Sequence, residues 1–459
     1  MTRSYDAVVI GAGPAGLSAA WRMARRGLDV LVVERSERVG GMSGSFTVGG
    51  VSVDFGSHRL HPSISPEILG ALRELLGAEL QERRRNGRIR LQGRWVAFPL
   101  RAADMVSRLP RGFALRASVD AVVSPFRRPR RDSFAEVVRA GLGPTVGEGF
   151  YRPYARKIWG VDPEQLHGDL AHRRVSARSP VDVARRVLPG RPRTGAGFYY
   201  PKHGFGAICD CLAEAAVTAG AELRLGAELT GIDVTAGEVA LDDGSSATGG
   251  VVLSTAPLGR TIRRVKPPPA RLVDLLGGLE HRSVVLVYLL LAQERYTEFD
   301  AHYFPAPDVA MSRLSEPKNY RDGEDPAART VLCAEIPCWA GDAIWEASPA
   351  EAGEIVSGAL PDQGLPAVEA VEVQVKRLRD VYPVYRLNYR DHLEPVMSWV
   401  AGQDRFVTLG RQGLFVPDNT HHALAMGWEA AECVRPGLPF DKSRWERALD
   451  AFSRHVVED

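Results

Sequence analysis

The N-terminal part of the chain constrains its fold more than any other segment. An apolar, β-branched run over residues 5–10 leads directly into Gly11-Ala-Gly-Pro-Ala-Gly16. A helical pattern over residues 17–26 and a second strand-like run over residues 30–33 follow, and Glu34 ends that run. This order of strand, glycine turn, helix, strand and acid predicts a dinucleotide-binding βαβ unit.

Each part of the glycine turn has a physical role in holding a dinucleotide. Gly11 permits the tight turn, Gly13 lets the backbone approach a pyrophosphate, and Gly16 lets the helix pack closely on the sheet. The helix presents unpaired N–H groups and the positive end of its dipole to the phosphates. Glu34 follows at about the spacing expected, roughly 20 residues, for an acid that accepts ribose hydroxyl groups.

The residues after Glu34 indicate which dinucleotide is bound. Glu34-Arg35 is followed by Gly40-Gly41 and by VDFGSH over residues 53–58. This pattern resembles the FAD-binding signature of the superfamily that contains amine oxidases, phytoene desaturases and protoporphyrinogen oxidases. The resemblance implies FAD as the cofactor. It also implies an α/β fold in which a Rossmann-like FAD-binding domain is interleaved with an α+β substrate domain.

The length of the chain, 459 residues, is too great for one compact core, so we expect two intertwined domains. The FAD-binding domain is predicted over residues 1–75, 200–265 and 396–459, and the substrate domain over 76–199 and 266–395. Expected helices cover 66–82, 204–219 and 420–434, the last with Thr420 as its N-cap, and a helical pattern runs through 101–196. Expected strands form a hairpin over 88–100 that turns at Gln92-Gly93, and further strands lie within 221–234, 238–255 and 281–293. Residues 406–415 are expected to form a final strand that leads into a loop.

Four further motifs resemble those of UDP-galactopyranose mutase and its flavoprotein relatives, and they occur in the same order. They are Gly56-Ser-His58, then Tyr154, Lys157 and Trp159, then Arg174 and Arg178, and finally Gly410-Arg411. The resemblance implies that reduced FAD isomerises a nucleotide-activated sugar between pyranose and furanose forms without net redox change. It assigns Arg174 to the departing diphosphate, Arg411 to the flavin or phosphate, Trp159 to stacking and His58 to a place beside the flavin.

The same resemblance gives the residues expected to bind FAD. They are Gly11, Gly13, Pro14, Ala15, Gly16, Glu34, Arg35, Gly40, Gly41, Met42, Gly56, Ser57, His58, Leu229, Thr255, Gly410, Arg411, Asn419 and Thr420. The expected partners are a nucleotide sugar as substrate, NADPH as a candidate reductant and a second copy of the chain in a candidate homodimer.

The chain departs from the mutase pattern in two places, and alternatives therefore stay open. Residues 416–419 carry no tyrosine where mutases bind the diphosphate, and Arg174-Val-Ser lacks the mutase proline. An FAD-dependent oxidoreductase that oxidises an amine, an alcohol or a C–C bond is the main alternative, and a flavin-bearing binding protein is a weaker one. Trp159 could equally be a core residue and Lys157 a surface charge, and His61, His421 and His422 are interpreted as structural or capping residues.

Composition excludes several other classes of protein. A net charge of +2 implies no general field for nucleic acid or for a membrane surface, and no apolar run reaches the roughly 18 residues that would span a bilayer. The five cysteines form no CxxC pair, which argues against a disulfide framework or a zinc site and favours the cytoplasm. No metal-ligand spacing and no GxSxG elbow are present. The basic runs at 83–85 and 127–131 are interpreted as solvated surface, with a site for an anionic substrate as the alternative for either run.

Overall fold

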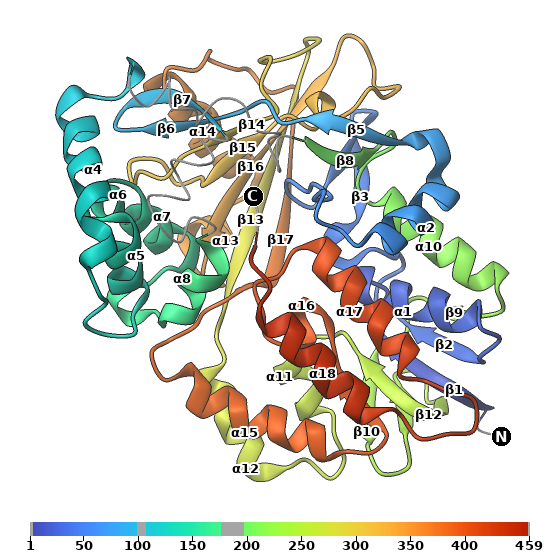
Figure 1. Cartoon of the computed structure of the whole chain (residues 1–459). Coiled ribbons are helices and arrows are strands. Elements are labelled where there is room, and N and C mark those ends of the chain that lie inside the picture. The colour runs from blue at the N-terminus through green and yellow to red at the C-terminus, as the bar shows by residue number, and fades with distance from the viewer. Residues whose placement is uncertain (1–2, 99–106, 176–196, 458–459) are drawn as a thin grey trace.

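The computed structural model describes residues 3–98, 107–175 and 197–457 (Figure 1). Among them, seven strands form the first sheet: β1 (Arg3–Ile10), β2 (Val30–Val33), β9 (Glu222–Arg224), β10 (Leu229–Asp233), β11 (Glu238–Leu241), β12 (Ser246–Ser254) and β18 (Phe406–Thr408). Their order is β10-β11-β12-β1-β2-β9, and β18 also pairs with β12. The pairs around β1 are parallel, whereas β10, β11 and β12 are antiparallel.

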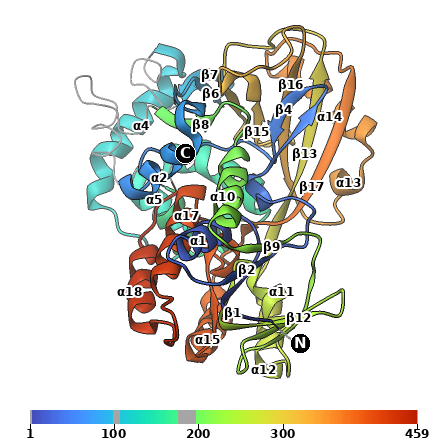
Figure 2. The same cartoon turned by 90° about the vertical axis from the view of Figure 1, so that its right-hand side faces the viewer.

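Helices cover both faces of the first sheet, which explains why β1 is an unbroken apolar run. Ala7 and Val9 of β1 pack into one core with α1 (Pro14–Ala24), α2 (Pro66–Leu76), α10 (Ala207–Thr218), α17 (Thr420–Glu432) and α18 (Lys442–Ser453). Val8 and Ile10 point to the other face and pack with α11 (Leu258–Arg263) and α15 (Tyr389–Gly402). Figure 2 shows α1 and α17, which are in contact, near the centre of the molecule.

The second sheet also has seven described strands. They are β6 (Gly87–Leu91), β7 (Arg94–Phe98), β13 (His281–Leu291), β14 (Ala301–Tyr303), β15 (Arg313–Ser315), β16 (Thr330–Cys338) and β17 (Glu372–Pro383), in the order β17-β13-β16-β15-β14-β6-β7. Alternate residues of β13 pack against α14 (Pro349–Asp362) on one face and against the hairpin of β3 (Ser45–Val48) and β4 (Val51–Asp54) on the other. This hairpin therefore joins the N-terminal segment to the second sheet.

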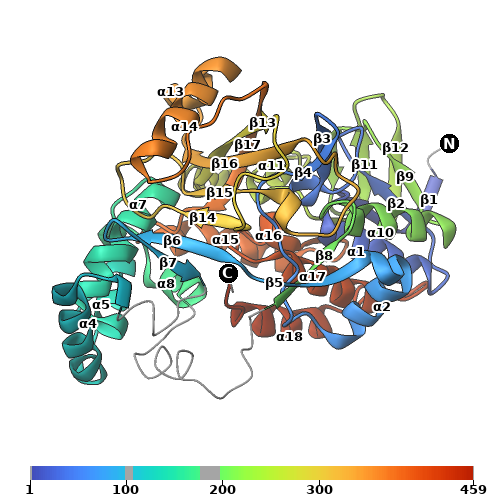
Figure 3. The ribbon, with the colours of Figure 1, turned by 90° about the horizontal axis from the view of Figure 1, so that it is seen from above.

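A group of helices forms one end of the molecule, opposite the first sheet (Figure 3). These helices are α4 (Arg111–Val123), α5 (Phe134–Leu142), α6 (Pro144–Val146), α7 (Arg152–Trp159) and α8 (Gly168–Arg174), with the 3₁₀ helix η3 (Ser124–Phe126) and the π-helix η4 (Gly147–Tyr151) between them. Further elements are β5 (Leu80–Arg84), which pairs with β8 (Gly197–Pro201), and the short helices α12 (Ala270–Leu275), α13 (Ala343–Glu346) and α16 (Gly410–Gly413).

The mixed α/β fold that the sequence predicts is confirmed, and so is the hairpin at Gln92-Gly93, where both residues have positive φ. The division into two domains with the stated boundaries stays a prediction. Two local predictions are wrong. The helix expected over 66–82 ends at Leu76, because Gly77 takes a φ of 55° and the chain then enters β5. The N-cap of α17 is Asn419 rather than Thr420, because Asn419 has the extended backbone and its side chain closes a capping box with His422.

The five cysteines are free thiols, and four of them are buried. In the part of the chain that the structure describes, no helix is both long enough and apolar enough to cross a membrane.

Candidate active site

A single cavity of about 2690 Å³ connects the two sheets. At one end it is lined by residues that follow the carboxyl ends of three parallel strands: Gly11 after β1, Glu34 after β2 and Thr255 after β12. At the other end it is lined by Arg313 and Glu335 of the second sheet. Ligands of open parallel sheets bind outside the carboxyl ends of the strands, so the first end is the expected place for a dinucleotide.

The structure brings nearly all the sequence-predicted site residues to the wall of this cavity. Those that line it are Gly11, Gly13, Pro14, Ala15, Glu34, Arg35, Gly41, Met42, Gly56, Ser57, His58, Trp159, Arg174, Leu229, Thr255, Gly410, Arg411, Asn419 and Thr420. Gly16 and Gly40 do not. A Cβ on Gly16 would lie 2.0 Å from the Gly11 carbonyl oxygen, and Gly40 makes a turn with a φ of 107°. These two glycines shape the wall from behind, and Arg178 lies outside the described residues.

The geometry at the first end fits a dinucleotide. No atom lies within 4 Å of the position that a Cβ on Gly13 would take, so the backbone there is open to an approaching group. The first turn of α1 follows Gly13 with no side-chain cap, which leaves its N–H groups available to phosphate oxygens. Glu34 is buried, and its carboxylate accepts hydrogen bonds from the backbone N–H groups of Ala12 and Ser36, both at 2.9 Å. A carboxylate has lone pairs beyond these two for ribose hydroxyls.

A buried ion pair lies at the second end. Arg313 of β15 and Glu335 of β16 are cross-strand neighbours, and the guanidinium meets the carboxylate through two hydrogen bonds of 2.9 and 2.7 Å. The Ser57 N–H also donates to Glu335, at 2.6 Å. Burial opposes the charge on Arg313, but the attraction of Glu335 and its neighbours prevails and the pKa of Arg313 is raised. No motif in the sequence predicted this pair, although a single acid within the apolar run of β16 is a signal that could have indicated it.

Two arginines meet an aromatic ring beside this pair. The guanidinium carbons of Arg174 and Arg411 lie 5.7 and 5.6 Å from the centre of the Tyr382 ring. Arg174 also lies 5.8 Å from the centre of the Trp159 ring. Arg411 donates to the carbonyl oxygens of Val381 and Asp418, so it also fixes the end of β17. Sequence reasoning identified both arginines but not Tyr382, which lies in a strand with no motif around it.

Trp159 is both a core residue and a cavity residue. Its ring is 4% exposed and packs 5.5 Å from the ring of Phe134. Its indole N–H is buried and has no hydrogen-bond partner among the described residues. An unpaired buried donor on a cavity wall is a group that a ligand can satisfy.

His58 and Lys157 have different surroundings: His58 lines the cavity, whereas Lys157 is bonded to a neighbouring loop. His58 lines the cavity, stacks 5.2 Å from the Phe205 ring, and has a pKa lowered by burial, so its imidazole is neutral. Lys157 is not a surface charge. Its ammonium donates to the carbonyl oxygens of Phe304, Ala306 and Met311, and burial lowers its pKa to about 8. Lys157 therefore fastens a loop to α7. The basic run at 83–85 lines the cavity as well, whereas solvated surface was the main expectation for it.

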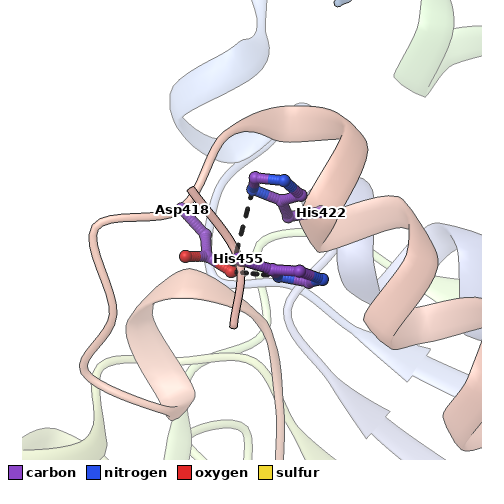
Figure 4. A group of neighbouring side chains, drawn as sticks. All are labelled: Asp418, His422 and His455. Carbon is purple, nitrogen blue, oxygen red and sulfur yellow. Dashed lines mark hydrogen bonds and ion pairs between the residues drawn. The ribbon is translucent and has the colours of Figure 1, made fainter. Parts of the chain in front are cut away.

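A group of polar side chains lies where the C-terminal segment meets α17 (Figure 4). Asp418, His422 and His455 bring one ligand atom each to within 4.8 Å of one another, an arrangement that the sequence spacing does not reveal. The rings of His422 and His455 are nearly parallel, at 13°, so their in-plane lone pairs do not converge on one point. Arg173 lies 3.6 Å from Asp418 and would oppose a cation. The Asp418–His455 hydrogen bond of 2.7 Å instead anchors the C-terminal segment.

The comparisons with known proteins agree with this geometry. A family profile described as flavin-containing amine oxidoreductase matches residues 14–375. The chain belongs to this family. It is therefore an FAD-dependent enzyme of the amine oxidase superfamily, as the resemblance in its motifs implies.

Individual relatives point to different activities. The chain is 28% identical over 286 residues to a Mycobacterium tuberculosis (strain ATCC 25618 / H37Rv) protein named as a flavin-containing monoamine oxidase, a match that covers 58% of this chain and 60% of that protein. It is 28% identical over 351 residues to the phytoene dehydrogenase of Streptomyces griseus, covering 67% of this chain and 62% of that one. The chain thus spans about three fifths of the length of these curated relatives. The structure of reduced UDP-galactopyranose mutase superposes with a TM-score of 0.81 at 21% identity, covering 100% of this chain and 98% of that chain, and it shows the fold alone.

Proposed function

We propose that this FAD enzyme is a mutase-like isomerase that acts on a nucleotide-activated sugar and exchanges its pyranose and furanose forms without net redox change. The observation that carries the proposal is the setting of Arg174. Its guanidinium stands on the cavity wall between the rings of Trp159 and Tyr382, and it has no acidic partner among the described residues. A guanidinium presents a planar donor fork that matches phosphate, so a diphosphate is the group that best completes this site.

The charges around the cavity support an anionic substrate over a cationic amine. Glu335 is the buried carboxylate at the second end, and Arg313 already neutralises it through two hydrogen bonds. Arg174 and Arg411 add positive charge beside it. An ammonium group would meet net repulsion here, whereas a phosphate would be stabilised. The indole of Trp159 offers a ring face and an unpaired N–H to the sugar or base.

In this proposal the cavity residues divide into two groups. The glycine turn at 11–16, Glu34, Gly41, Thr255 and the first residues of α17 hold FAD, and Arg174, Trp159 and Tyr382 hold the substrate. FAD in its reduced state, with NADPH as the candidate reductant, supplies the electron-rich centre that the isomerisation requires. Arg174 stabilises the negative charge that develops on the departing diphosphate, because its donors are already oriented by the two rings.

Dependence on reductant tests the reaction type. Reduced enzyme is mixed anaerobically with UDP-galactose, and the nucleotide sugars are separated by chromatography while the flavin absorbance is followed. Many turnovers for each equivalent of dithionite are expected, with the flavin still reduced at the end. Stoichiometric bleaching of the oxidised flavin by a substrate would contradict the isomerase proposal.

A binding experiment tests the substrate class separately from turnover. UDP is titrated into reduced enzyme by calorimetry, and Arg174→Lys is compared with Arg139→Lys, an exposed arginine of α5 outside the cavity. Loss of the donor fork should weaken UDP binding by about ten- to a hundredfold in Arg174→Lys, because hydrogen bonds to charged groups contribute about 1.5–3 kcal/mol. Equal affinities in the two variants would show that Arg174 does not hold the diphosphate.

An FAD-dependent oxidoreductase is the second candidate, and one feature of the cavity favours it. Ile89, Leu91, Phe98 and Phe150 give the cavity an apolar, aromatic wall that could hold a hydrocarbon. The family description and the curated relatives also name oxidoreductases. Putrescine and a polyene are therefore the probes to add to the anaerobic assay, and reduction of the oxidised flavin by either one would favour this candidate.

A further inference from the structure

Helix α4 is apolar on the side that faces away from the protein. Leu115, Val119, Val122 and Phe126 recur at intervals of four, three and four residues, and they continue along one side of α4 into η3. Their exposed fractions are 67, 56, 73 and 86%. Single exposed apolar residues are ordinary, but a continuous stripe of four large ones indicates a surface that binds a partner. We call these four residues the outer stripe.

The opposite side of α4 already packs against the protein, so the outer stripe is not a core-facing side that has been turned outward. Phe113 is buried in a cluster with Ile89 and Leu91, two residues that line the cavity. Asp120 is also buried, and it accepts hydrogen bonds from the Thr145 N–H and from Arg127. Figures 1 and 3 show α4 at the outer edge of the molecule, with its inner side toward the other helices. The helix therefore has a fixed orientation that directs the outer stripe to solvent.

The surroundings of the outer stripe carry a strong positive charge. Residues 107–132 hold seven arginines and two aspartates, in a chain whose net charge is only +2. One of the two aspartates, Asp120, is buried and paired. Within the described ranges no ion-pair or hydrogen-bond partner of the side chain is found for five exposed arginines: Arg111, Arg116, Arg128, Arg130 and Arg131. An apolar stripe bordered by unpaired cations is the pattern of a helix that lies in the plane of an anionic membrane surface.

We propose that the outer stripe and its arginines dock the enzyme on the surface of a bilayer rich in anionic phospholipid. The apolar side chains enter the boundary between headgroups and acyl chains, and the arginines contact the lipid phosphates. Docking of this kind is peripheral and requires no spanning helix. It holds the apolar wall of the cavity within one helix thickness of the lipid, because Phe113 on the inner side of α4 packs against that wall.

Charge favours a bilayer over a second copy of the chain as the occupant. Two copies that met through the outer stripe would bring both sets of unpaired arginines to the rim of one interface. Like charges placed opposite each other oppose association, and this region offers no acidic patch to balance them. An anionic lipid surface complements both the apolar stripe and the cations.

Vesicle flotation with the FAD-loaded, full-length protein tests the proposal. Vesicles of equimolar phosphatidylcholine and phosphatidylglycerol are compared with vesicles of phosphatidylcholine alone. The wild-type protein should float with the anionic vesicles and stay in solution with the neutral ones. Replacing the outer stripe by serine should lower the partition coefficient at least about tenfold, since four large side chains would no longer leave water. The matched control replaces four exposed apolar residues elsewhere: Ile355→Ser, Val371→Ser, Leu387→Ser and Leu438→Ser.

A charge variant tests the electrostatic part without touching the stripe. Arg128→Gln, Arg130→Gln and Arg131→Gln together should reduce partitioning about a hundredfold, because each arginine near an anionic surface contributes about a factor of five. Its control replaces three exposed arginines outside the region: Arg94→Gln, Arg271→Gln and Arg447→Gln. Thermal unfolding of every variant verifies that the fold is retained.

Two results would overturn the proposal. The first is a wild-type protein that binds neither vesicle, or binds both equally. The second is a wild-type dimer that ignores vesicles and becomes monomeric in the serine variant by sedimentation velocity, which would assign the outer stripe to contact between two copies.

Discussion

Glu34 has two tasks that substitution can separate. Its carboxylate accepts the backbone N–H groups of Ala12 and Ser36, both at 2.9 Å, and it also lines the cavity at the expected ribose position. Glu34→Ala removes both carboxylate oxygens that accept these hydrogen bonds. Ser36 is exposed, so water can replace its partner, but Ala12 is fully buried. An orphaned buried N–H costs about 1–3 kcal/mol, and the free energy of unfolding of the apoprotein should fall by that amount.

FAD affinity should respond differently in two variants of Glu34. Loss of a charge-assisted bond to ribose weakens binding about ten- to a hundredfold in Glu34→Ala. Glu34→Gln keeps one acceptor oxygen for Ala12, so its free energy of unfolding should stay near the wild-type value while the Kd for FAD still rises. Urea unfolding of the apoprotein and fluorescence titration with FAD give the two quantities, and the exposed Glu74→Gln serves as the control. An unchanged Kd in Glu34→Gln would refute the ribose contact, and an unchanged unfolding free energy in Glu34→Ala would refute the backbone role.

Three further predictions concern other parts of the structure. Trp159→Phe should raise KM for the substrate while the melting temperature moves little, because removal of an unpaired N–H offsets the lost packing; a purely structural tryptophan would show the reverse. Gly427→Ala should destabilise the protein by about 1–3 kcal/mol, since the new Cβ would lie 2.0 Å from the Ala15 carbonyl oxygen, whereas Gly358→Ala, with open space around it, should not. Burial, together with His61 and His455, lowers the pKa of His421 to about 3, so the unfolded state alone takes up this proton as the pH falls below about 6.5. The free energy of unfolding should therefore fall as the pH is lowered from about 6.5 to about 3, by at most about 1.4 kcal/mol per pH unit. Chemical unfolding measured across this pH range should show a smaller fall in His421→Gln.

The cofactor end of the site could be predicted because its determinants are local. Gly11, Gly13, Gly16 and Glu34 lie in one strand–turn–helix–strand segment, where backbone hydrogen bonds and the period of the apolar residues fix the geometry. Gly41 and Asn419, which line the same cavity, lie in a glycine pair and at a helix cap, and both of these are also short-range signals. Thr420 shows the limit of such signals. Two adjacent residues could each have capped α17, and only the backbone conformation decided for Asn419.

The substrate end could not be derived in the same way, because it depends on register and on packing across the chain. Arg313 meets Glu335 only because β15 and β16 pair with those residues opposite each other. Arg174 reaches Tyr382 only because α8 packs near the end of β17, more than two hundred residues later in the chain. Arg313 lies in a short strand with no motif around it, and the single acid in the apolar run of β16 indicates a buried charge but not which residue pairs with it.

By itself, therefore, the sequence of this protein determined a βαβ cofactor unit, the FAD superfamily and the identity of several arginines. The tertiary structure decided which of those arginines face the cavity, that Lys157 fastens a loop, and that the apolar side of α4 faces outward. The physical reason is that backbone geometry repeats over a few residues and can be recognised locally. Burial and charge pairing are instead set by side chains that the folded chain brings together from distant segments.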